Sequence, residues 1–376
     1  MSILLLLLAC APEPPPVAPA PASRAAPRAQ ATTDAVMIKP AERDPKWSGA
    51  VCNDGTPFGL TLRQGTSDTW VIKVAGGYFC DDIVTPCEGR QQRLITTPTR
   101  KDGPIADKGD VVLRGDGLFS TSADDNPVFH DANHVELHYC SSDLWVGSSP
   151  DRQATTGAPE GWFFAGRANI RAALEVLAEQ HGLDDGKLDT KVLLVGSSAG
   201  GMGVIGNLPT WIDKLPQTRA RGGLKVLLDG AWVPPQPTLD DTPKANRWGS
   251  LLPACEAEKT KQKRDPLECV FGPSWYPHFA TAGVPVLIQQ SAQDLTQLKV
   301  YGVKDEASAR AWRDNARSSF EGVSWLYSGG FPYHIVAFDP KFTQGAPGQT
   351  FRDVVTAFWT DGEPQRVLFR YEEKKP

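Results

Sequence analysis

The chain has 376 residues, 40% of them hydrophobic, and a formal net charge of −5 at pH 7. This length is enough for one large α/β domain with insertions. The 39 basic residues are dispersed and do not interleave with aromatic residues, so the sequence predicts no nucleic-acid partner.

The amino terminus predicts export. Residues 1–10 carry the apolar run Ile3–Leu8 and end in Leu7-Leu8-Ala9-Cys10, which resembles a bacterial lipoprotein signal with Cys10 as the acylated residue. The alternative is a fortuitous apolar start, because Met1-Ser2 lacks the positive charge of such signals. The run is too short to span a bilayer. We therefore expect a membrane lipid anchor on Cys10, in the bacterial cell envelope, or secretion.

Composition separates a tether from a folded domain. Residues 11–45 begin with Ala11–Ala31, which is packed with Pro and Ala, lacks apolar periodicity and predicts an extended tether. We place the folded domain at 46–376 and expect a monomer.

The cysteines agree with export. Without Cys10 an even number remains, which predicts disulfides in an exported chain. These are Cys52, Cys80, Cys87, Cys140, Cys255 and Cys269. Short spacings favour the pairs Cys80–Cys87 and Cys255–Cys269, which leaves Cys52 and Cys140 either paired or free. No C-x-x-C spacing indicates a zinc site.

The first strand that we predict is Trp70–Val74, followed by Ala75-Gly76-Gly77-Tyr78. Two glycines after a strand often form a plain tight turn. Beside a nucleophile, the same loop can offer a backbone N–H of Gly77 or Tyr78 to an oxyanion.

Three histidines recur at every fourth residue: His130, His134 and His138. On a helix they would share a face and resemble a metal-ligand set. Because polar and apolar residues alternate from His134 to Tyr139, we predict a strand whose histidines face solvent, and no metal.

The most informative segment is Gly196-Ser197-Ser198-Ala199-Gly200. It follows the apolar run Lys191–Val195, which itself follows a predicted crossover helix over Gly166–Gln180. G-x-S-x-G at a strand-to-helix turn is typical of the nucleophile elbow of α/β-hydrolases. We therefore predict Ser198 as nucleophile and the N–H of Ala199 as an oxyanion donor. The alternative is an ordinary strand-loop-helix turn.

In this fold the acid and then the histidine follow the serine. Predicted strands at Leu224–Leu228, Val284–Gln289 and Val323–Tyr327 come next. His334 follows the last of them and is our predicted base, whereas we expect a packing or pocket role for His278.

The acid has two candidates, each directly behind one of these strands. Asp294 lies on the loop that precedes the histidine-bearing strand, so it can reach the imidazole directly and is preferred. Asp229 is the alternative, and we interpret it as a turn residue beside Gly230.

A long connection, Pro234–Phe279, separates two of the strands. Loops of this length are usually functional or disordered. We predict a cap insertion at 234–283, held by Cys255–Cys269. Three of its aromatic residues either contact substrate or pack the cap itself: Trp248, Trp275 and Tyr276.

Several segments together resemble the pectin acetylesterase family, most closely its Notum-type carboxylesterase branch. They are Ala75–Cys87, Tyr139–Trp145, Gly196–Gly201 and the contexts of Asp294 and His334, in the expected order from about Val51 to about Trp359. The resemblance implies an α/β-hydrolase fold with a mostly parallel sheet, and a triad of Ser198, Asp294 and His334. It also implies oxyanion amides from Gly77, Tyr78 and Ala199. Tyr78 is a departure, because both branches typically carry tryptophan there.

These observations predict an exported serine carboxylesterase that needs no metal or organic cofactor. We expect it to remove O-acetyl, or other O-acyl, groups from extracellular or envelope glycans. One alternative is a long-chain acyl esterase that acts on lipid or acylated protein. The other is a non-catalytic binding lipoprotein on a hydrolase fold.

Overall fold

The computed structural model describes residues 35–80, 87, 89–90, 94–97, 113, 115–148, 161–186, 188–235, 251–329, 332–344 and 348–368. Within these residues nine strands form one sheet in the order β1-β2-β4-β3-β5-β6-β7-β8-β9. Only the β1–β2 and β2–β4 pairs of this sheet are antiparallel. The strands are β1 Val36–Ile38, β2 Leu60–Arg63, β3 Thr69–Val74, β4 Asn133–Leu137, β5 Lys191–Ser197, β6 Leu224–Asp229, β7 Val286–Gln289, β8 Trp325–Ser328 and β9 Arg366–Leu368.

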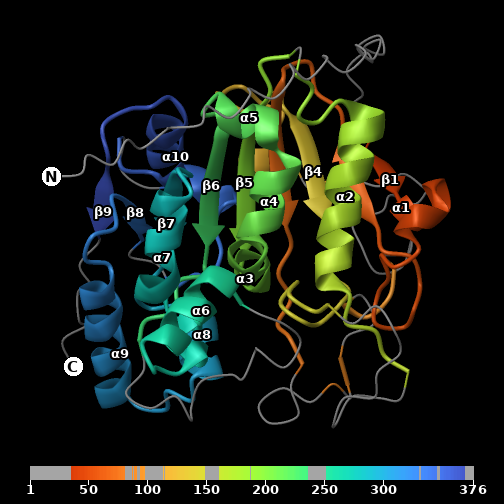
Figure 1. Cartoon of the computed structure of the whole chain (residues 1–376). Helices are drawn as coiled ribbons and strands as arrows, with labels where there is room; N and C mark the ends of the chain where they lie inside the picture. The colour runs from red at the N-terminus through yellow and green to blue at the C-terminus, as the bar shows by residue number, and fades with distance from the viewer. Residues whose placement is uncertain are drawn as a thin grey trace, which may run out of the picture.

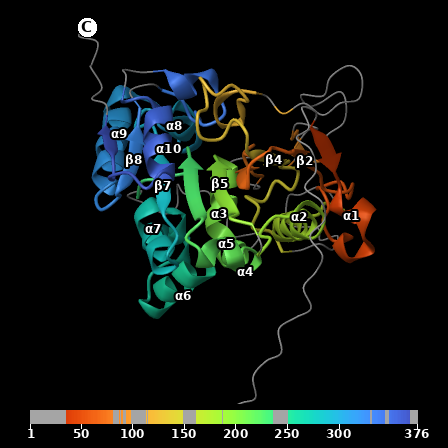
Figure 2. The same cartoon turned by 90° about the horizontal axis from the view of Figure 1, so that it is seen from above.

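Helices cover both faces of the sheet, as Figure 2 shows for α2 and α4 on one side and α10 on the other. They are α1 Pro40–Arg43, α2 Gly166–His181, α3 Ala199–Gly206, α4 Leu208–Lys214, α5 Pro216–Ala220, α6 Pro253–Lys261, α7 Gly272–Thr281, α8 Leu295–Val300, α9 Glu306–Ser319 and α10 Phe351–Trp359. Alternate residues of β5 enter two separate apolar cores: Leu194 packs in the core with α2, and Leu193 in the core with α10. Burial on both faces explains why β5 is a continuous apolar run.

This architecture is the predicted α/β-hydrolase fold, with a mostly parallel sheet and flanking helices. The arrowheads of β5 and β6 point toward the end of the sheet where α3 and α8 lie (Figure 1). The loops that follow the parallel strands therefore meet at that end, where α/β proteins place their sites.

The folded domain begins earlier than the sequence indicates. β1 lies inside the 11–45 range predicted as a tether, and Val36 pairs with Leu62 of β2. Ile38 is buried. The boundary at residue 45 is therefore corrected: an apolar triplet after the Pro/Ala-rich part adds an edge strand to the sheet. Cys10 and most of the tether lie outside the described residues.

The histidine-bearing strand β4 exists, but the prediction that its histidines face solvent is wrong. His134 is fully buried, its Nε2–H donates to the Phe129 carbonyl at 2.7 Å, and its Nδ1 contacts the Arg63 guanidinium. Burial, with Arg63 adding to it, lowers the pKa of His134 to about 3. The reason is that β4 lies between two strands with both sheet faces covered, so alternation no longer marks a solvated side.

The neighbouring side chains are also paired within the protein. His138 Nε2 lies 2.6 Å from the Thr61 hydroxyl, and Lys73 forms an ion pair with Glu136 at 2.7 Å. Across the described ranges, no group of three or more His, Cys, Asp or Glu residues is placed to hold a metal ion.

Three disulfides join the six cysteines of the domain: Cys52–Cys140, Cys80–Cys87 and Cys255–Cys269. They fit a protein that folds in an oxidising compartment. In the part of the chain that the structure describes, no helix is long and apolar enough to cross a membrane.

Residues 251–283, the main described part of the predicted cap, contain α6, the short 3-10 helix Pro266–Val270 and α7. Cys255–Cys269 links α6 to the 3-10 helix. Trp275 is fully buried and packs edge-on against Trp232, 5.3 Å between ring centroids, and Tyr276 packs against the same ring. These two aromatics therefore pack against each other and join the segment to Trp232, which lies just before the predicted cap. Trp248 lies outside the described residues.

Candidate active site

Ser198 sits on a strained turn between β5 and α3, with φ 55° and ψ −123°. Glycine is required around it: a Cβ on Gly200 would lie 1.9 Å from the Val74 carbonyl oxygen, and one on Gly196 2.5 Å from Gly201 Cα. The Ser198 N–H donates to the Asp229 carbonyl at 2.8 Å. The glycine spacing seen in the sequence therefore lets the turn pack against neighbouring backbone while the hydroxyl projects from it.

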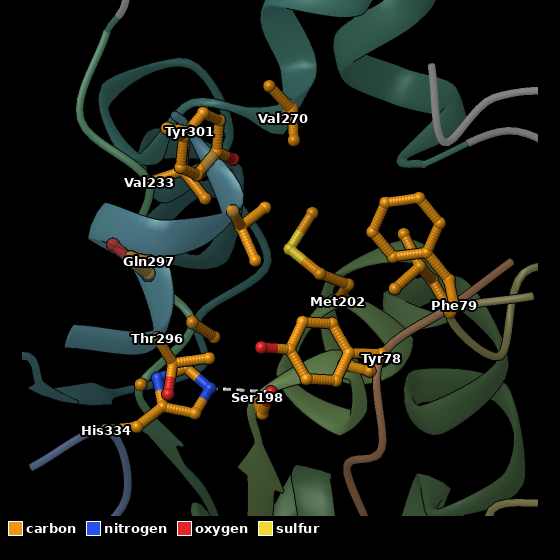
Figure 3. A pocket seen from close by; sticks show the side chains of 15 residues that line it. Tyr78, Phe79, Ser198, Met202, Val233, Val270, Thr296, Gln297, Tyr301 and His334 are labelled. Carbon is orange, nitrogen blue, oxygen red and sulfur yellow. Dashed lines mark hydrogen bonds between the residues drawn. The ribbon is translucent and has the colours of Figure 1, made fainter. Parts of the chain in front are cut away.

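Ser198, His334 and Asp294 are hydrogen-bonded in series (Figure 3). The Ser198 hydroxyl lies 2.7 Å from His334 Nε2, and His334 Nδ1 lies 2.6 Å from Asp294 Oδ2. Because an ionised carboxylate only accepts, Nδ1 carries the proton and Nε2 is free to accept from the serine. The structure thus brings together three residues that are 136 and 40 positions apart in the chain.

Asp294 is fully buried. It caps the N-terminus of α8, where Oδ1 accepts from the N–H groups of Thr296 and Gln297, each at 3.0 Å. Oδ2 accepts from Gln290 Nε2 at 2.9 Å as well as from His334. Four donors therefore hold the carboxylate in one orientation. The sequence analysis missed Gln290, because no spacing rule predicts a contact within the loop between β7 and α8.

The glycine loop after β3 lies against the nucleophile. A Cβ on Gly76 would meet the Ser197 carbonyl oxygen at 2.5 Å and Ser198 Cβ at 2.8 Å, so only glycine allows this approach. Within the described part of the chain, no hydrogen bond takes up the backbone N–H of Gly77, Tyr78 or Ala199. Tyr78 and Ala199 line the pocket beside Ser198, and their role as oxyanion donors, like that of Gly77, stays a prediction.

Asp229, the alternative acid, makes no hydrogen bond to the imidazole. It is fully buried at the end of β6, and its carboxylate accepts from the N–H groups of Val336 and Ala337. Burial raises the pKa of Asp229 to about 6, against the opposing effects of these two hydrogen bonds and of His334. Its side chain thus contacts the loop of His334, which is more than the turn role that the sequence indicated. His278 lies elsewhere, 3.4 Å from Glu258.

A pocket that is partly open to solvent adjoins Ser198. Most of its lining is apolar: Tyr78, Phe79, Leu144, Ala199, Met202, Ala231, Val233, Val270, Val300 and Tyr301. Figure 3 shows Tyr78 and Met202 on one side of it, and Thr296 and Gln297 with His334 on the other. Of the predicted cap, Val270 lines the pocket, whereas Trp275 and Tyr276 do not. Sequence reasoning missed this lining because its members come from separate loops.

The sheet order, the elbow after β5 and the serine, histidine and aspartate in series define an α/β-hydrolase of the serine-nucleophile type. More particularly, the chain belongs to the pectinacetylesterase family, a family of carboxylic-ester hydrolases, whose model matches residues 28–324.

Within the family, the chain is similar to Notum proteins. It is 31% identical over 307 residues to palmitoleoyl-protein carboxylesterase NOTUM of Drosophila melanogaster, covering 76% of this chain and 43% of that protein. The human NOTUM is 28% identical, with 68% of this chain and 51% of that protein covered. The chain thus spans about half the length of the curated relatives it matches. A solved structure of the Wnt deacylase Notum from Drosophila superposes with a TM-score of 0.69 at 25% identity, over 86% of this chain and 94% of that one.

Proposed function

We propose that this chain is a serine carboxylesterase that works through an acyl-enzyme. The observation that carries the proposal is the hydrogen-bonded series from Ser198 through His334 to the buried carboxylate of Asp294. In the first half-reaction, His334 takes the hydroxyl proton as the Ser198 oxygen attacks the ester carbonyl. Asp294 keeps the imidazole in the required tautomer and stabilises its cationic form.

The remaining steps use groups that already surround the serine. The N–H groups of Ala199 and of Gly77 or Tyr78 bind the oxyanion of the tetrahedral intermediate. His334 then gives its proton to the leaving alcohol. Water, deprotonated by the same imidazole, attacks the acyl-enzyme and releases the carboxylic acid, which returns Ser198 to its starting state.

The pocket supports an acyl chain longer than the acetyl group that we expected from the sequence. Acetyl carries a single methyl group, whereas most of the side chains that line the pocket are apolar. Each buried CH₂ contributes about 0.8 kcal/mol of transfer free energy, so apolar side chains around the pocket favour a longer chain. The relatives named palmitoleoyl-protein carboxylesterases cleave esters of this kind. O-acetyl removal from glycans becomes the second candidate, supported by the family name alone.

Exposed apolar side chains near the triad also favour a lipophilic ester. Singly exposed apolar side chains are common on protein surfaces, whereas contiguous ones often mark binding surfaces. Tyr78 is 40% exposed, Leu295 61% and Ile335 42%. Leu295 directly follows Asp294, and Ile335 directly follows His334. Exposed apolar side chains next in sequence to two triad residues suit a lipophilic ester that reaches the site from solvent.

The site of action is also a proposal. The three disulfides support an oxidising compartment outside the cytosol. A lipid anchor on Cys10 would then keep the enzyme at the cell envelope. Labelling with a clickable fatty acid, with Cys10→Ser as the control, tests the anchor: label on both proteins, or on neither, contradicts it.

The proposed activity is tested by hydrolysis of p-nitrophenyl esters from acetate to palmitate, with Ser198→Ala as the control. We expect turnover that increases from acetate to longer chains and is lost in the variant. A maximum at acetate would favour the deacetylation candidate. Activity that does not depend on Ser198, or none at any chain length, would contradict the esterase and leave the binding protein as the better account.

A further inference from the structure

The proposed reaction leaves the buried carboxylate of Asp229 without a role, although Asp229 touches both halves of the site. It ends β6, where it pairs with Ser197 of β5 on one side and Gln289 of β7 on the other. Its carbonyl oxygen accepts the N–H of Ser198 at 2.8 Å. The backbone of Asp229 thus fixes the nucleophile turn.

The side chain of Asp229 fixes the other half. Oδ1 accepts the N–H of Val336 at 3.0 Å, and Oδ2 accepts the N–H of Ala337 at 3.0 Å. These two residues are the second and third after His334. Hydrogen bonds to a charged acceptor are the strong ones, about twice as strong as neutral ones. One buried carboxylate therefore holds the chain directly behind the imidazole.

The next residue, Gly230, lies against the histidine itself. A Cβ there would be 2.3 Å from the His334 carbonyl oxygen and 3.1 Å from Nδ1. Gly230 also has φ +71°, which favours glycine. Asp229 and Gly230 therefore lie against three residues of this loop: His334, Val336 and Ala337.

We propose that Asp229 is a positioning residue, whose carboxylate holds the 334–337 loop so that the two nitrogens of His334 reach Ser198 and Asp294 together. This inference rests on the proposed function, because it assumes that His334 moves the proton. The charge of Asp229 contributes as well: the ionised carboxylate and a protonated imidazole attract each other. The other charged group acting on Asp229 is Lys73 of β3, which is paired with Glu136.

The test is a double-mutant cycle with Asp229→Asn and His334→Ala on the full-length protein. Asparagine keeps the shape of the side chain but loses the charge and turns an N–H donor toward the loop. We expect Asp229→Asn to lower kcat by up to about 100-fold with KM little changed, since a displacement of roughly 1 Å has such an effect. In the His334→Ala background the same substitution should leave the residual rate unchanged, because the imidazole it positions is gone.

Asp184→Asn is the matched control. Asp184 also accepts two consecutive backbone N–H groups, those of Gln217 and Thr218, but at α5, at the opposite end of the sheet from α8 (Figure 1). We expect its loss to leave kcat unchanged. If Asp229→Asn does not fold, Asp229→Ser is used in its place, because serine keeps one oxygen acceptor without the charge.

The outcomes separate the two proposals. If wild type hydrolyses esters and Ser198→Ala does not, but Asp229→Asn retains wild-type kcat, the positioning role is wrong and the esterase stands. Equal losses from Asp229→Asn with and without His334 would also overturn it, because they would show an effect that bypasses the imidazole. If wild type hydrolyses no ester, the proposed function itself fails.

Discussion

Two aspartates, Asp229 and Asp294, follow neighbouring parallel strands, are both fully buried, and differ in what the histidine loop presents to them. Asp294 receives the imidazole Nδ1, two amides of α8 and the Gln290 side chain. Asp229 receives only backbone N–H groups from beyond His334. Both residues are therefore placed where the acid can lie. Their roles differ because the loop after β8 brings the His334 imidazole to Asp294 and backbone N–H groups to Asp229.

Removing the charge from Asp294 has the largest expected effect on kcat. In Asp294→Asn, an amide NH₂ can face His334 Nδ1, which favours the wrong tautomer, so we expect kcat to fall by about 10⁴-fold. The measurement is steady-state hydrolysis of a p-nitrophenyl ester, with Asp229→Asn beside it. A smaller loss in Asp294→Asn than in Asp229→Asn would reverse the two roles.

The next largest effect concerns stability against pH. The folded-state pKa of Asp229, about 6, lies above its ordinary value of 3.8, so its contribution to the free energy of unfolding is complete below about pH 4 and lost as pH rises through 6. Asparagine does not titrate. The stability of wild type relative to Asp229→Asn should therefore fall by on the order of 2 to 3 kcal/mol between pH 4 and 7.

Urea unfolding of both proteins across this pH range measures the difference. Because the charges of His334 and Lys73 act on Asp229, the pair is also compared in a His334→Gln background. A difference that is constant with pH would show that Asp229 is not a strained buried carboxylate.

Gly230→Ala tests the backbone contact between Gly230 and His334. The new Cβ would lie 2.3 Å from the His334 carbonyl oxygen, so the loop must move. We expect kcat to fall on the order of 100-fold. Gly222→Ala is the control, because Gly222 has a similar φ of +68° but no atom within 4 Å of the added Cβ. Equal kcat values in the two variants would contradict the contact between Gly230 and His334.

Gln290→Met has the smallest expected effect. It removes one of four donors to Asp294, while the two α8 amides and His334 remain. A hydrogen bond to a charged group contributes about 1.5 to 3 kcal/mol, so we expect a loss in kcat on the order of 10-fold. The assay is the same, and a loss as large as that of Asp294→Asn would mean that Gln290 acts directly in the reaction.

The local parts of this molecule could be predicted from sequence. The nucleophile elbow is one such part. The atoms that require glycine at 196 and 200 lie within a few residues of the elbow or at the end of the neighbouring strand β3. Most of the parallel strands were predicted from apolar runs, with ends that differ by one or two residues: Val284–Gln289 was predicted and Val286–Gln289 is observed. The edge strand β9 was not predicted.

What depended on distant contacts could not be predicted. β1 forms because Val36 pairs with Leu62, and His134 is buried because separate segments cover its strand. The pocket draws side chains from loops more than 200 residues apart, from Tyr78 to His334. The contacts of Asp229 with Val336 and Ala337 span 107 and 108 residues, beyond any spacing rule.

Covalent labelling by a fluorophosphonate directly tests whether Ser198 is the nucleophile and His334 its base. The purified protein is treated with the reagent, digested, and the modified residue is located by mass spectrometry, with His334→Ala as the comparison. The account predicts one adduct, on Ser198, and much slower labelling in the variant because no base takes the hydroxyl proton. An adduct on another residue, or labelling of Ser198 at the same rate without His334, would contradict it.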